Sequence, residues 1–348
     1  MKGFFKFLPA AACFLALAAQ NSPAQVADFK GADNVLFECK LDGFSQADYA
    51  KAVSAIFLDF ENEALCRIKP KKYGKVGLKI YSNSGAGLAT PKNLTLAVIA
   101  ELEKRGFKRE NICIVDMSRR KMREAGYLPK YSDLLSENSR DDFFGSPVCD
   151  IESGKFFDKN WFYDNPLTPR DMKFGQIRDA EYLGEARKSY LPIPLFLTVD
   201  FWINLPVITD MRGIGICAAL GNATIWNMSN NERFFASPAN APIALAEVAA
   251  IPELKESCLM AILSYEKAQF VGGGVFNAAF VSSEKTLYAS SNPVILDYYA
   301  LDYINCKRVM GGFKPISPAP PIFEYARQMN LGTCDTSKIK FKAVKNAD

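Results

Sequence analysis

The clearest pattern of hydrophobic and polar positions lies in the first third of the chain. An apolar run at 76–81 predicts a strand, and the small residues at 82–89 predict a loop. Apolar positions then recur with helical spacing up to Gly106, and a second apolar run at 112–115 predicts another strand. Because short loops join the strand, the helix and the next strand, the segment predicts a right-handed βαβ unit with two parallel strands.

Other segments show the same two periodicities. Residues 45–60 predict an amphipathic helix, with Ser45 and Asp48 placed to form a capping box at its start. Thr90 and Asn292 precede two more helices as capping residues, each followed by a proline in the first turn. Further expected elements are strands at 195–199, 201–208, 259–263 and 286–289, helices at 241–249 and 293–305, and an edge strand at 338–344.

The segment from about residue 128 to 190 breaks this regular pattern. It is rich in Asp, Ser, Asn, Pro and aromatic residues and has no clear period, which predicts loops, a lid or an antiparallel ribbon. Its aromatic run at 156–163 offers an alternative role, an exposed patch for interaction or assembly. We therefore expect one α/β domain over 25–348, with a mainly parallel sheet, flanking helices and a loop-rich insertion near 128–190.

The first 24 residues have the pattern of a secretory signal peptide. Lys2 and Lys6 form a short basic start, and the apolar run at 7–19 is too short to span a bilayer. Small residues at the required spacing favour cleavage after Ala24. Since no later segment is long and apolar enough to cross a membrane, we expect an exported protein, periplasmic or extracellular, without stable membrane insertion.

Composition narrows the chemistry that is open to this chain. Its 348 residues include no histidine, which excludes Ser-His and Cys-His nucleophile pairs and histidine metal ligands. Drift in composition and loss of a function explain this absence equally well. A net charge of +4, from 42 basic and 38 acidic residues, gives no indication of nucleic acid as a partner.

Eight cysteines follow the predicted signal peptide, and none of them form a C-x-x-C pair. This argues against an iron–sulfur cluster, a zinc ribbon and a thioredoxin-type site. An even number of cysteines in an oxidising compartment permits disulfides. Cys113 and Cys258 lie in apolar runs and are expected to be buried free thiols. Any pairing is expected among the loop-flanked cysteines, which are Cys39, Cys66, Cys149 and Cys334.

Candidate chemistry gathers where the predicted strands end, because open parallel sheets bind ligands at the carboxyl ends of their strands. Asp116 and Asp200 each close an apolar run and are candidate general bases with Lys79 as a nearby cation, while turn formation is the alternative. The loop after the first strand offers backbone N–H groups to an anion, although its glycines would also serve a tight turn. The ligand-binding candidates at this rim are Ser82, Asn83, Ser84, Gly85, Gly87, Thr90, Thr209, Asp210 and Asn292.

Two further features have simpler interpretations. The glycines at 272–274 are expected to form a flexible loop rather than a phosphate cradle. Asp297 lies early in its predicted helix, where a favourable contact with the helix dipole explains it. Scattered cysteines and carboxylates do not suggest a metal site, and the sequence leaves any cofactor unidentified.

Six sequence stretches together resemble the domain-of-unknown-function (DUF) family 362. They are GLKIYSNSGAGLATPKNL, VDFWINLPVITD, GNATIWN, ALAEVAAIPELKESCLMAILSYEKAQFVGGG, TLYASSNPVILDYYALDYI and MNLGTCDTSKIKF. The resemblance runs over about residues 65–340, and it rests on the order and spacing of these stretches. It implies an α/β fold but little biochemistry, because the family is largely uncharacterised. Positions that match its pattern are Lys79, Thr90, Asp200, Asn204, Pro206, Gly215, Asn222, Pro293 and Asp297.

The chain departs from the family pattern along one predicted rim. Two cations, a histidine and two carboxylates that family members often carry are missing, and the residues found there include Met211, Gly221, Ser264 and Asn292. A general base or a metal ligand cannot be replaced by Met or Gly without loss of that role. We therefore expect a divergent member that binds an unidentified small anionic ligand, with Asn222 among its binding residues and catalysis lost. The alternative is a histidine-independent enzyme with an Asp general base beside Lys79.

Overall fold

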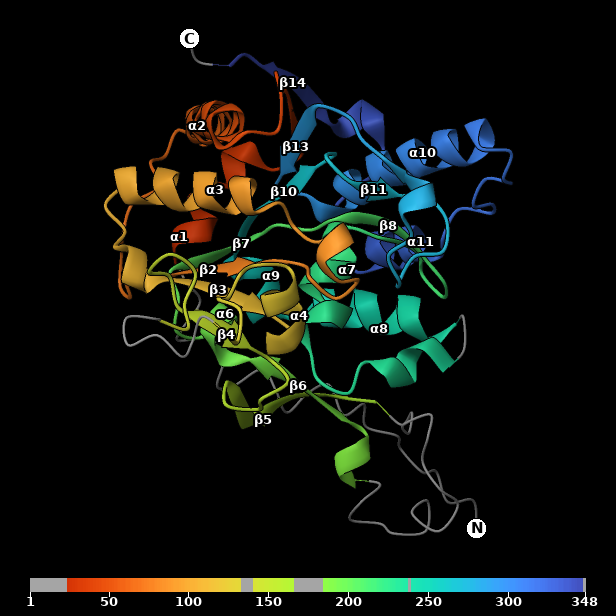
Figure 1. Cartoon of the computed structure of the whole chain (residues 1–348), viewed down its shortest axis with the longest axis horizontal. Helices are drawn as coiled ribbons and strands as arrows, with labels where there is room; N and C mark the ends of the chain where they lie inside the picture. Colours follow the sequence, from red (N-terminus) through yellow and green to blue (C-terminus); the bar gives the residue numbers. More distant parts are fainter. Residues whose placement is uncertain (1–23, 133–139, 166–183, 237–238, 347–348) are drawn as a thin grey trace, which may run out of the picture.

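The computed structural model describes residues 24–132, 140–165, 184–236 and 239–346, so the predicted signal peptide lies outside the described residues except for Ala24. In the described part, eight strands form one large sheet. Their order across the sheet is β14 (Lys340–Val344), β1 (Val35–Lys40), β13 (Thr286–Ser290), β10 (Cys258–Ser264), β7 (Phe201–Asn204), β2 (Val76–Lys79), β3 (Ile112–Asp116) and β4 (Val148–Asp150). Helices lie on both faces of this sheet, which confirms the α/β fold class (Figure 1).

The large sheet is parallel except for one strand. β13 runs antiparallel to both β1 and β10, and the other neighbouring pairs run parallel. The predicted βαβ unit is present, since β2 and β3 pair in parallel with Leu78 opposite Ile114 and are joined by α3 (Lys92–Lys104). The carboxyl ends of β2, β3, β7 and β10 therefore share one edge. β13 ends toward the other edge, because Leu287 near its start is paired with Ser264 at the end of β10, and Ser290 at its end is paired with Ala261 in the middle of β10.

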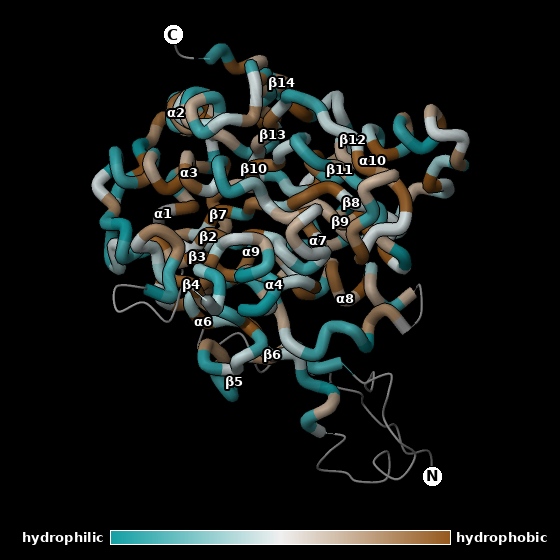
Figure 2. Tube along the Cα trace, viewed as in Figure 1, coloured by the Kyte–Doolittle hydropathy of each residue, from teal (hydrophilic) through white to brown (hydrophobic). Residues whose placement is uncertain are grey.

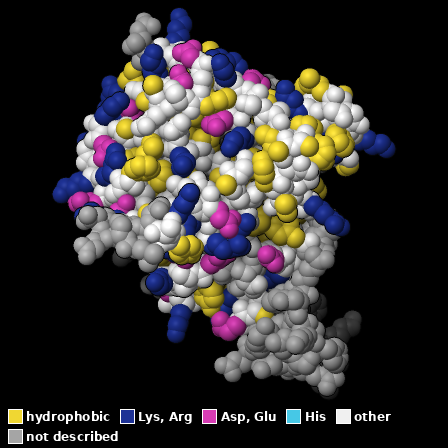
Figure 3. All heavy atoms as spheres, in the orientation of Figure 1, with side chains coloured by type: hydrophobic (Ala, Val, Ile, Leu, Met, Phe, Trp, Pro, Cys, Tyr) yellow, Lys and Arg dark blue, Asp and Glu magenta, His cyan; other side chains and the backbone are white. Residues whose placement is uncertain are grey.

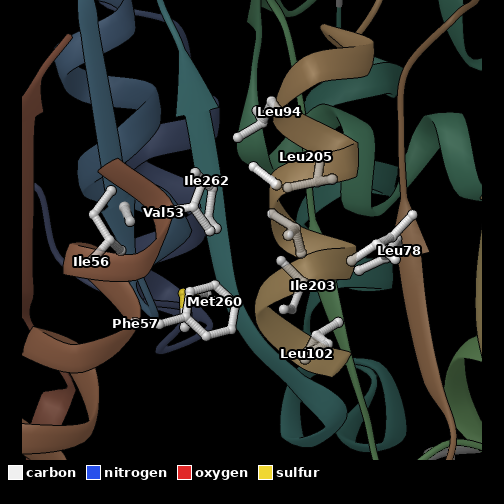
Figure 4. Packing of buried hydrophobic residues seen from close by; sticks show 14 of the residues in the cluster. Val53, Ile56, Phe57, Leu78, Leu94, Leu102, Ile203, Leu205, Met260 and Ile262 are labelled. Atoms are coloured by element: carbon white, nitrogen blue, oxygen red, sulfur yellow. The ribbon is translucent and has the colours of Figure 1, made fainter. Parts of the chain in front are cut away.

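Two long helices cover one face of the sheet. α2 (Gln46–Ala64) and α3 lie side by side, and their apolar faces pack onto the central strands. Figure 4 shows this layer, where the labelled side chains are Val53, Ile56, Phe57, Leu78, Leu94, Leu102, Ile203, Leu205, Met260 and Ile262. Burying each side chain of this kind contributes roughly 1.5–3 kcal/mol. The layer therefore makes a large contribution to the stability of the fold.

Local sequence signals set the ends of these helices. The Asp48 N–H donates to the Ser45 hydroxyl and the Ser45 N–H donates to the Asp48 carboxylate, which confirms the capping box. The chain leaves α3 through Gly106, whose φ of +92° is a left-handed conformation that glycine adopts readily. Asn292 caps α10 (Pro293–Met310) as predicted, by accepting hydrogen bonds from the first N–H groups of the helix.

The opposite face carries several short helices, the long helix α10 (Pro293–Met310) and a small second sheet. The helices are α6 (Ile193–Phe196), α7 (Ala219–Ala223), α8 (Asn240–Ala249), α9 (Pro252–Ser257), α10 and α11 (Ile322–Gln328). The small sheet contains β12 (Val281–Ser282), β11 (Ala268–Gln269), β8 (Ile208–Met211) and β9 (Gly215–Cys217), in that order. Its apolar side chains and those of α10 form a buried cluster of their own against the large sheet. This second sheet is not among the predicted elements.

α4 (Arg119–Glu124) lies just before the predicted insertion, and the insertion contains β4 and an antiparallel ribbon. In the ribbon, β5 (Phe157–Asp164) pairs with β6 (Lys188–Pro192), which is one of the predicted alternatives. Trp161 stacks on the ring of Phe196, and Trp161 and its neighbours in the aromatic run are only half-buried. The aromatic run is therefore partly covered by the body of the protein and partly accessible.

Two predicted strands differ from the structure. Residues 195–199 form no strand, because Pro192 and Pro194 favour the start of the short helix α6 at this point. The apolar run at 201–208 divides into β7 and β8, with Pro206 in the turn between them, and the two strands belong to different sheets. Strands β1 and β4 have no counterpart among the predicted elements, since their apolar runs are too short to give a clear period.

All eight cysteines of the described residues are free thiols. Cys113 and Cys258 are therefore free, as predicted, but both residues are half-buried and not fully buried. Cys113 and Cys149 lie on the neighbouring strands β3 and β4, and the interaction between their thiol groups raises the pKa of Cys113. The expected disulfide pairing is not present among the loop-flanked cysteines, which are Cys39, Cys66, Cys149 and Cys334.

Hydropathy follows the layers of the fold. Hydrophobic residues concentrate in the strands and along the inner sides of the helices (Figure 2). On the face shown in Figure 3, basic and acidic side chains are interspersed, and hydrophobic side chains gather at the upper right, where Figure 1 places α10. In the described part of the chain, no helix is both long enough and apolar enough to span a membrane.

Candidate functional site

The structure brings Lys79 and Asp116 together where β2 and β3 end. The Lys79 Nζ lies 2.7 Å from the Asp116 Oδ1, and both side chains are 0% exposed. The other carboxylate oxygen of Asp116 accepts hydrogen bonds from the N–H and the hydroxyl group of Ser82, both at 2.6 Å. Asn222 of α7 completes the group, with its Oδ1 at 3.0 Å from the Lys79 Nζ. These four residues form a closed ionic cluster inside the protein.

The Lys79 ammonium group uses all three of its protons within the protein. They go to the Asp116 carboxylate, to the Asn222 Oδ1 and to the carbonyl oxygen of Ile80 at 2.6 Å. Burial lowers the pKa of the Lys79 amine, and the Asp116 charge opposes this effect. Because its protons are occupied and its surface is covered, Lys79 has no donor left for an external anion in this conformation.

Asp200 lies at the opposite edge of the sheet from this cluster. It directly precedes β7, in which Phe201 is paired with Val76 at the start of β2. The Asp200 carboxylate accepts hydrogen bonds of 2.8–3.0 Å from the backbone N–H groups of Lys71, Tyr73 and Gly74. Asp200 therefore fixes a loop and does not share a rim with Asp116, because the apolar run before Asp200 forms a helix and not a strand.

Asp210 binds the glycine run that follows β11. Its carboxylate accepts hydrogen bonds from the N–H groups of Gly272 at 3.2 Å and Gly273 at 2.6 Å, and Arg308 lies 3.2 Å from it. Burial raises the pKa of Asp210, while these partners oppose the increase. The neighbouring Thr209 is buried, and its hydroxyl group donates to the carbonyl oxygen of Asp210. The glycine run thus holds a carboxylate of the protein itself.

We expect Gly273→Ala to destabilise the protein by roughly 2–3 kcal/mol, because overpacking against backbone forces the chain to move. A Cβ at position 273 would lie 1.4 Å from the carbonyl oxygen of Asp210. Gly272→Ala is the matched control, since its Cβ meets open space and only the φ of +76° opposes it, at a cost of about 1 kcal/mol. Denaturant unfolding measures both losses, and equal losses would contradict the close approach at Gly273.

Asp297 is a fourth carboxylate that binds backbone N–H groups. It lies on α10, is 1% exposed, and accepts from the N–H groups of Ala219 at 2.6 Å and Leu220 at 3.3 Å. Burial raises the pKa of Asp297 to about 7, although both hydrogen bonds oppose the increase. The carboxylate therefore fixes the start of α7, and the simple contact with the dipole of its own helix is not its main interaction.

The loop between β2 and α3 is tied to its surroundings. Gly85 has a φ of +86°, which requires a left-handed backbone conformation. Gly87 lies under the ring of Phe276, because a Cβ there would lie 2.3 Å from two ring atoms. Ser84 is buried and its hydroxyl group forms a 2.7 Å hydrogen bond with that of Tyr81, whereas Asn83 is half-buried. The two glycines therefore serve a turn and a close packing contact.

Thr90 does not cap α3. The residue at the N-cap position is Pro91, and no side chain caps the helix there. The Thr90 hydroxyl group accepts from the N–H of Tyr81 at 2.9 Å and donates to the carbonyl oxygen of Leu205 at 2.6 Å. Thr90 thus links β2 to the end of β7. A hollow of about 190 Å³ beside it is lined by residues of both charges, including Lys92, Glu266 and Lys267.

A larger cavity, of about 600 Å³, opens toward the amino edge of the sheet. Its walls come from β7, the start of β10, α7, the end of α8, α9, the turn before α10, the loop around Leu331 and α1 (Ala24–Ala27). Most of its inner side chains are apolar, and the outer charged residues carry both signs, namely Lys30, Asp33, Lys255 and Glu256. This volume falls within the range of small-molecule sites, about 300–1,000 Å³.

Asn204 connects this cavity to the ionic cluster. It lines the cavity, its Oδ1 accepts from the Asn222 Nδ2 at 2.7 Å, and its Nδ2 donates to the carbonyl oxygen of Ala219 at 2.7 Å. Asn292 also lines the cavity, whereas Asp116, Asp200 and the predicted loop residues do not. Asn204 is not among the candidate site residues predicted from the sequence, where it is only a match to the family pattern. A polar residue inside the apolar strand FWIN is the signal that marks it.

Comparisons with known proteins do not indicate a family or a function for this chain. No family model matches the chain, and no curated protein matches it. A search of solved structures finds a crystal structure of a Thermotoga maritima protein, a structural genomics target, with a TM-score of 0.35 and 9% sequence identity. The match covers 77% of this chain, and this chain spans 59% of that protein. Among the described residues, no three Cys, Asp or Glu side chains are grouped to hold a metal ion.

Proposed function

We propose that this protein is a non-catalytic binding protein that holds one small organic molecule in the cavity at the amino edge of its sheet. The main observation in support of this proposal is the cavity of about 600 Å³. Trp202, Leu220 and Leu254 contribute apolar surface to its wall, and Asn204 contributes a buried polar group. Concave sites of this size, mainly apolar with a few placed polar groups, are typical of small-molecule binding.

The arrangement of the candidate carboxylates supports the absence of catalysis. A general base must reach the proton that it removes from the substrate. Each candidate carboxylate instead accepts hydrogen bonds from backbone N–H groups of another segment, and these residues are Asp116, Asp200, Asp210 and Asp297. Burial raises the pKa of the Cys217 thiol to about 12, so it remains protonated and a poor nucleophile at neutral pH.

The proposed ligand differs from the small anion that the sequence suggests. The expected cation, Lys79, is neutralised by Asp116 and has no exposed surface. At the cavity mouth, Lys30 and Lys255 stand beside Asp33 and Glu256, so neither sign of charge dominates. A mainly apolar ligand with a neutral polar group fits these surroundings better than a phosphate or a sulfate does.

We also propose that the chain is an exported, divergent member of DUF family 362. The order and spacing of the six stretches support the family, and the pattern of the first 24 residues supports export. Expression in an exporting host followed by N-terminal sequencing tests the second part. We expect the mature chain to begin at Gln25, and recovery of the chain with its first 24 residues retained would contradict export.

Titration with N-phenyl-1-naphthylamine, a neutral apolar fluorophore, tests binding in the cavity. We expect saturable binding that Ala249→Leu weakens at least about tenfold, because the larger side chain fills part of the cavity. Ala249 lines the cavity and its neighbour Ala250 does not, so Ala250→Leu is the matched control. Absence of binding, or equal binding by both variants, would exclude this site. Native mass spectrometry of the purified protein then identifies any molecule that co-purifies.

A further inference from the structure

We propose, on the premise of the proposed function, that Asn204 recognises the ligand of this cavity and that the ligand carries a carboxamide or lactam group. Asn204 lies on β7, two residues after Trp202, so both side chains are on the same face of the sheet. Both residues line the cavity, and each is 1% exposed. A polar side chain at this depth has to satisfy its hydrogen bonds within the protein or with what fills the cavity.

The hydrogen bonds of Asn204 leave part of its capacity unused. An asparagine side chain has two N–H donors and an oxygen that accepts two hydrogen bonds. Asn204 donates one hydrogen bond to the carbonyl oxygen of Ala219 and accepts one from the Asn222 Nδ2, each at 2.7 Å. One donor and one acceptor of Asn204 therefore have no partner among the described residues. A ligand that pairs with both forms two hydrogen bonds to groups of Asn204 that are otherwise poorly solvated.

The other buried polar side chains of the cavity wall are already occupied. The Asn292 Oδ1 accepts from two backbone N–H groups of α10, and its Nδ2 donates to Asn34 and to the carbonyl oxygen of Thr333. The Ser290 hydroxyl group donates to the carbonyl oxygen of Val35 and accepts from the N–H of Asn292. Asn292 and Ser290 thus hold the fold together, and Asn204 differs from them in its free donor and acceptor.

The ionic cluster fixes the orientation of the Asn204 amide. An ammonium group only donates, so the atom of Asn222 that faces Lys79 must be its oxygen, and the Asn222 nitrogen must face Asn204. Asn204 consequently presents its oxygen to Asn222 and its nitrogen to the carbonyl oxygen of Ala219. The amide cannot flip without losing both hydrogen bonds. Lys79 is therefore a positioning residue for the binding group, and the group is preorganised.

The unused donor and acceptor lie on one planar amide and select one class of ligand. A carboxamide or a lactam offers an N–H and a carbonyl oxygen together and can pair with both. An ionised carboxylate only accepts and an ammonium group only donates, so either would leave one group of Asn204 unpaired. The neighbouring indole of Trp202 and the side chain of Leu254 contact the apolar body of the ligand.

Competition between two probes of similar shape tests this assignment on the unmodified protein. Benzamide has the N–H and the carbonyl oxygen, whereas acetophenone has a methyl group in place of the amide nitrogen. We expect benzamide to displace N-phenyl-1-naphthylamine at a concentration about tenfold lower than acetophenone does. In Asn204→Leu, the fluorophore still binds and the two competitors become equal. Asn227→Leu is the matched control, since Asn227 is equally buried but does not line the cavity.

The outcomes separate the two proposals. Equal displacement by benzamide and acetophenone in the unmodified protein would overturn the assignment of Asn204, while the saturable binding of the fluorophore would still support the cavity as a binding site. Discrimination that survives in Asn204→Leu would also overturn the assignment. If the fluorophore does not bind at all, the cavity is not a binding site and both proposals fail. Because the probe comparison uses the unmodified chain, a variant that fails to fold does not affect it.

Discussion

Lys79→Met is expected to lower the free energy of unfolding by about 3–5 kcal/mol, because removing one partner of a buried ion pair leaves the other charge uncompensated. The Asp116 carboxylate would keep only the two hydrogen bonds from Ser82. Asn222 and the carbonyl oxygen of Ile80 would lose a donor as well. A loss of this size is a large fraction of the stability of a typical domain, about 5–15 kcal/mol. Urea unfolding at neutral pH, followed by circular dichroism, measures it.

A surface ion pair provides the control for this prediction. Lys104 lies 2.9 Å from Glu101 and its side chain is 63% exposed, so Lys104→Met is expected to cost less than about 1 kcal/mol. The double variant Lys79→Met with Asp116→Leu should recover part of the loss, since it leaves no isolated buried charge. If Lys79→Met cost no more than Lys104→Met, the cluster would not be the stabilising centre that its geometry indicates.

Features that depend on residues close in sequence were predictable. The capping box of Ser45 and Asp48, the glycine after α3 and the cap at Asn292 each involve partners within about five positions. The βαβ unit is predictable for the same reason, because one short segment contains all of its elements. The exception is Thr90, which has the composition of a cap but bonds to Tyr81 and to the distant Leu205.

The partners of the carboxylates could not be predicted. The sequence marks Asp residues at the ends of apolar runs as candidate bases and the loop at 82–89 as a candidate anion site, with turn formation as the alternative for both. In the folded chain, carboxylates and backbone N–H groups bind one another across large sequence separations, as Asp116 does with Ser82 and Asp210 with Gly273. The anion that these loops bind is a carboxylate of the same chain. Tertiary pairing of this kind leaves no local periodicity, so sequence patterns do not report it.

The cavity is also beyond sequence reasoning, since segments from Val26 to Gly332 supply its walls. Its position at the amino edge contrasts with the carboxyl edge, where open parallel sheets usually bind ligands. At the carboxyl edge of this sheet, the ionic cluster and the loop under Phe276 cover the ends of β2 and β3. The predicted ligand-binding rim is therefore covered, and the larger cavity lies at the opposite edge of the sheet.

The stability of the protein is expected to fall as the pH rises from about 4 to about 7, and Asp297→Asn is expected to reduce this fall strongly. Burial raises the pKa of Asp297 from 3.8 to about 7. A carboxyl group with a higher pKa in the folded state favours folding when it is protonated. Its contribution is therefore fully present below the unfolded pKa and is lost as the pH rises through the folded pKa. A difference of about three pKa units corresponds to a free energy of the order of 4 kcal/mol.

Denaturant unfolding of the unmodified protein and of Asp297→Asn between pH 4 and pH 8 measures this contribution. The amide oxygen of the variant can still accept from the N–H groups of Ala219 and Leu220, so the start of α7 remains held while the buried charge is removed. The ionisable neighbours Cys217 and Tyr265 have pKa values raised by burial and stay neutral over this range. Asp302→Asn, at an exposed position of the same helix, should leave the slope unchanged. A slope of the same size in Asp297→Asn and in the unmodified protein would show that Asp297 does not contribute to the pH dependence.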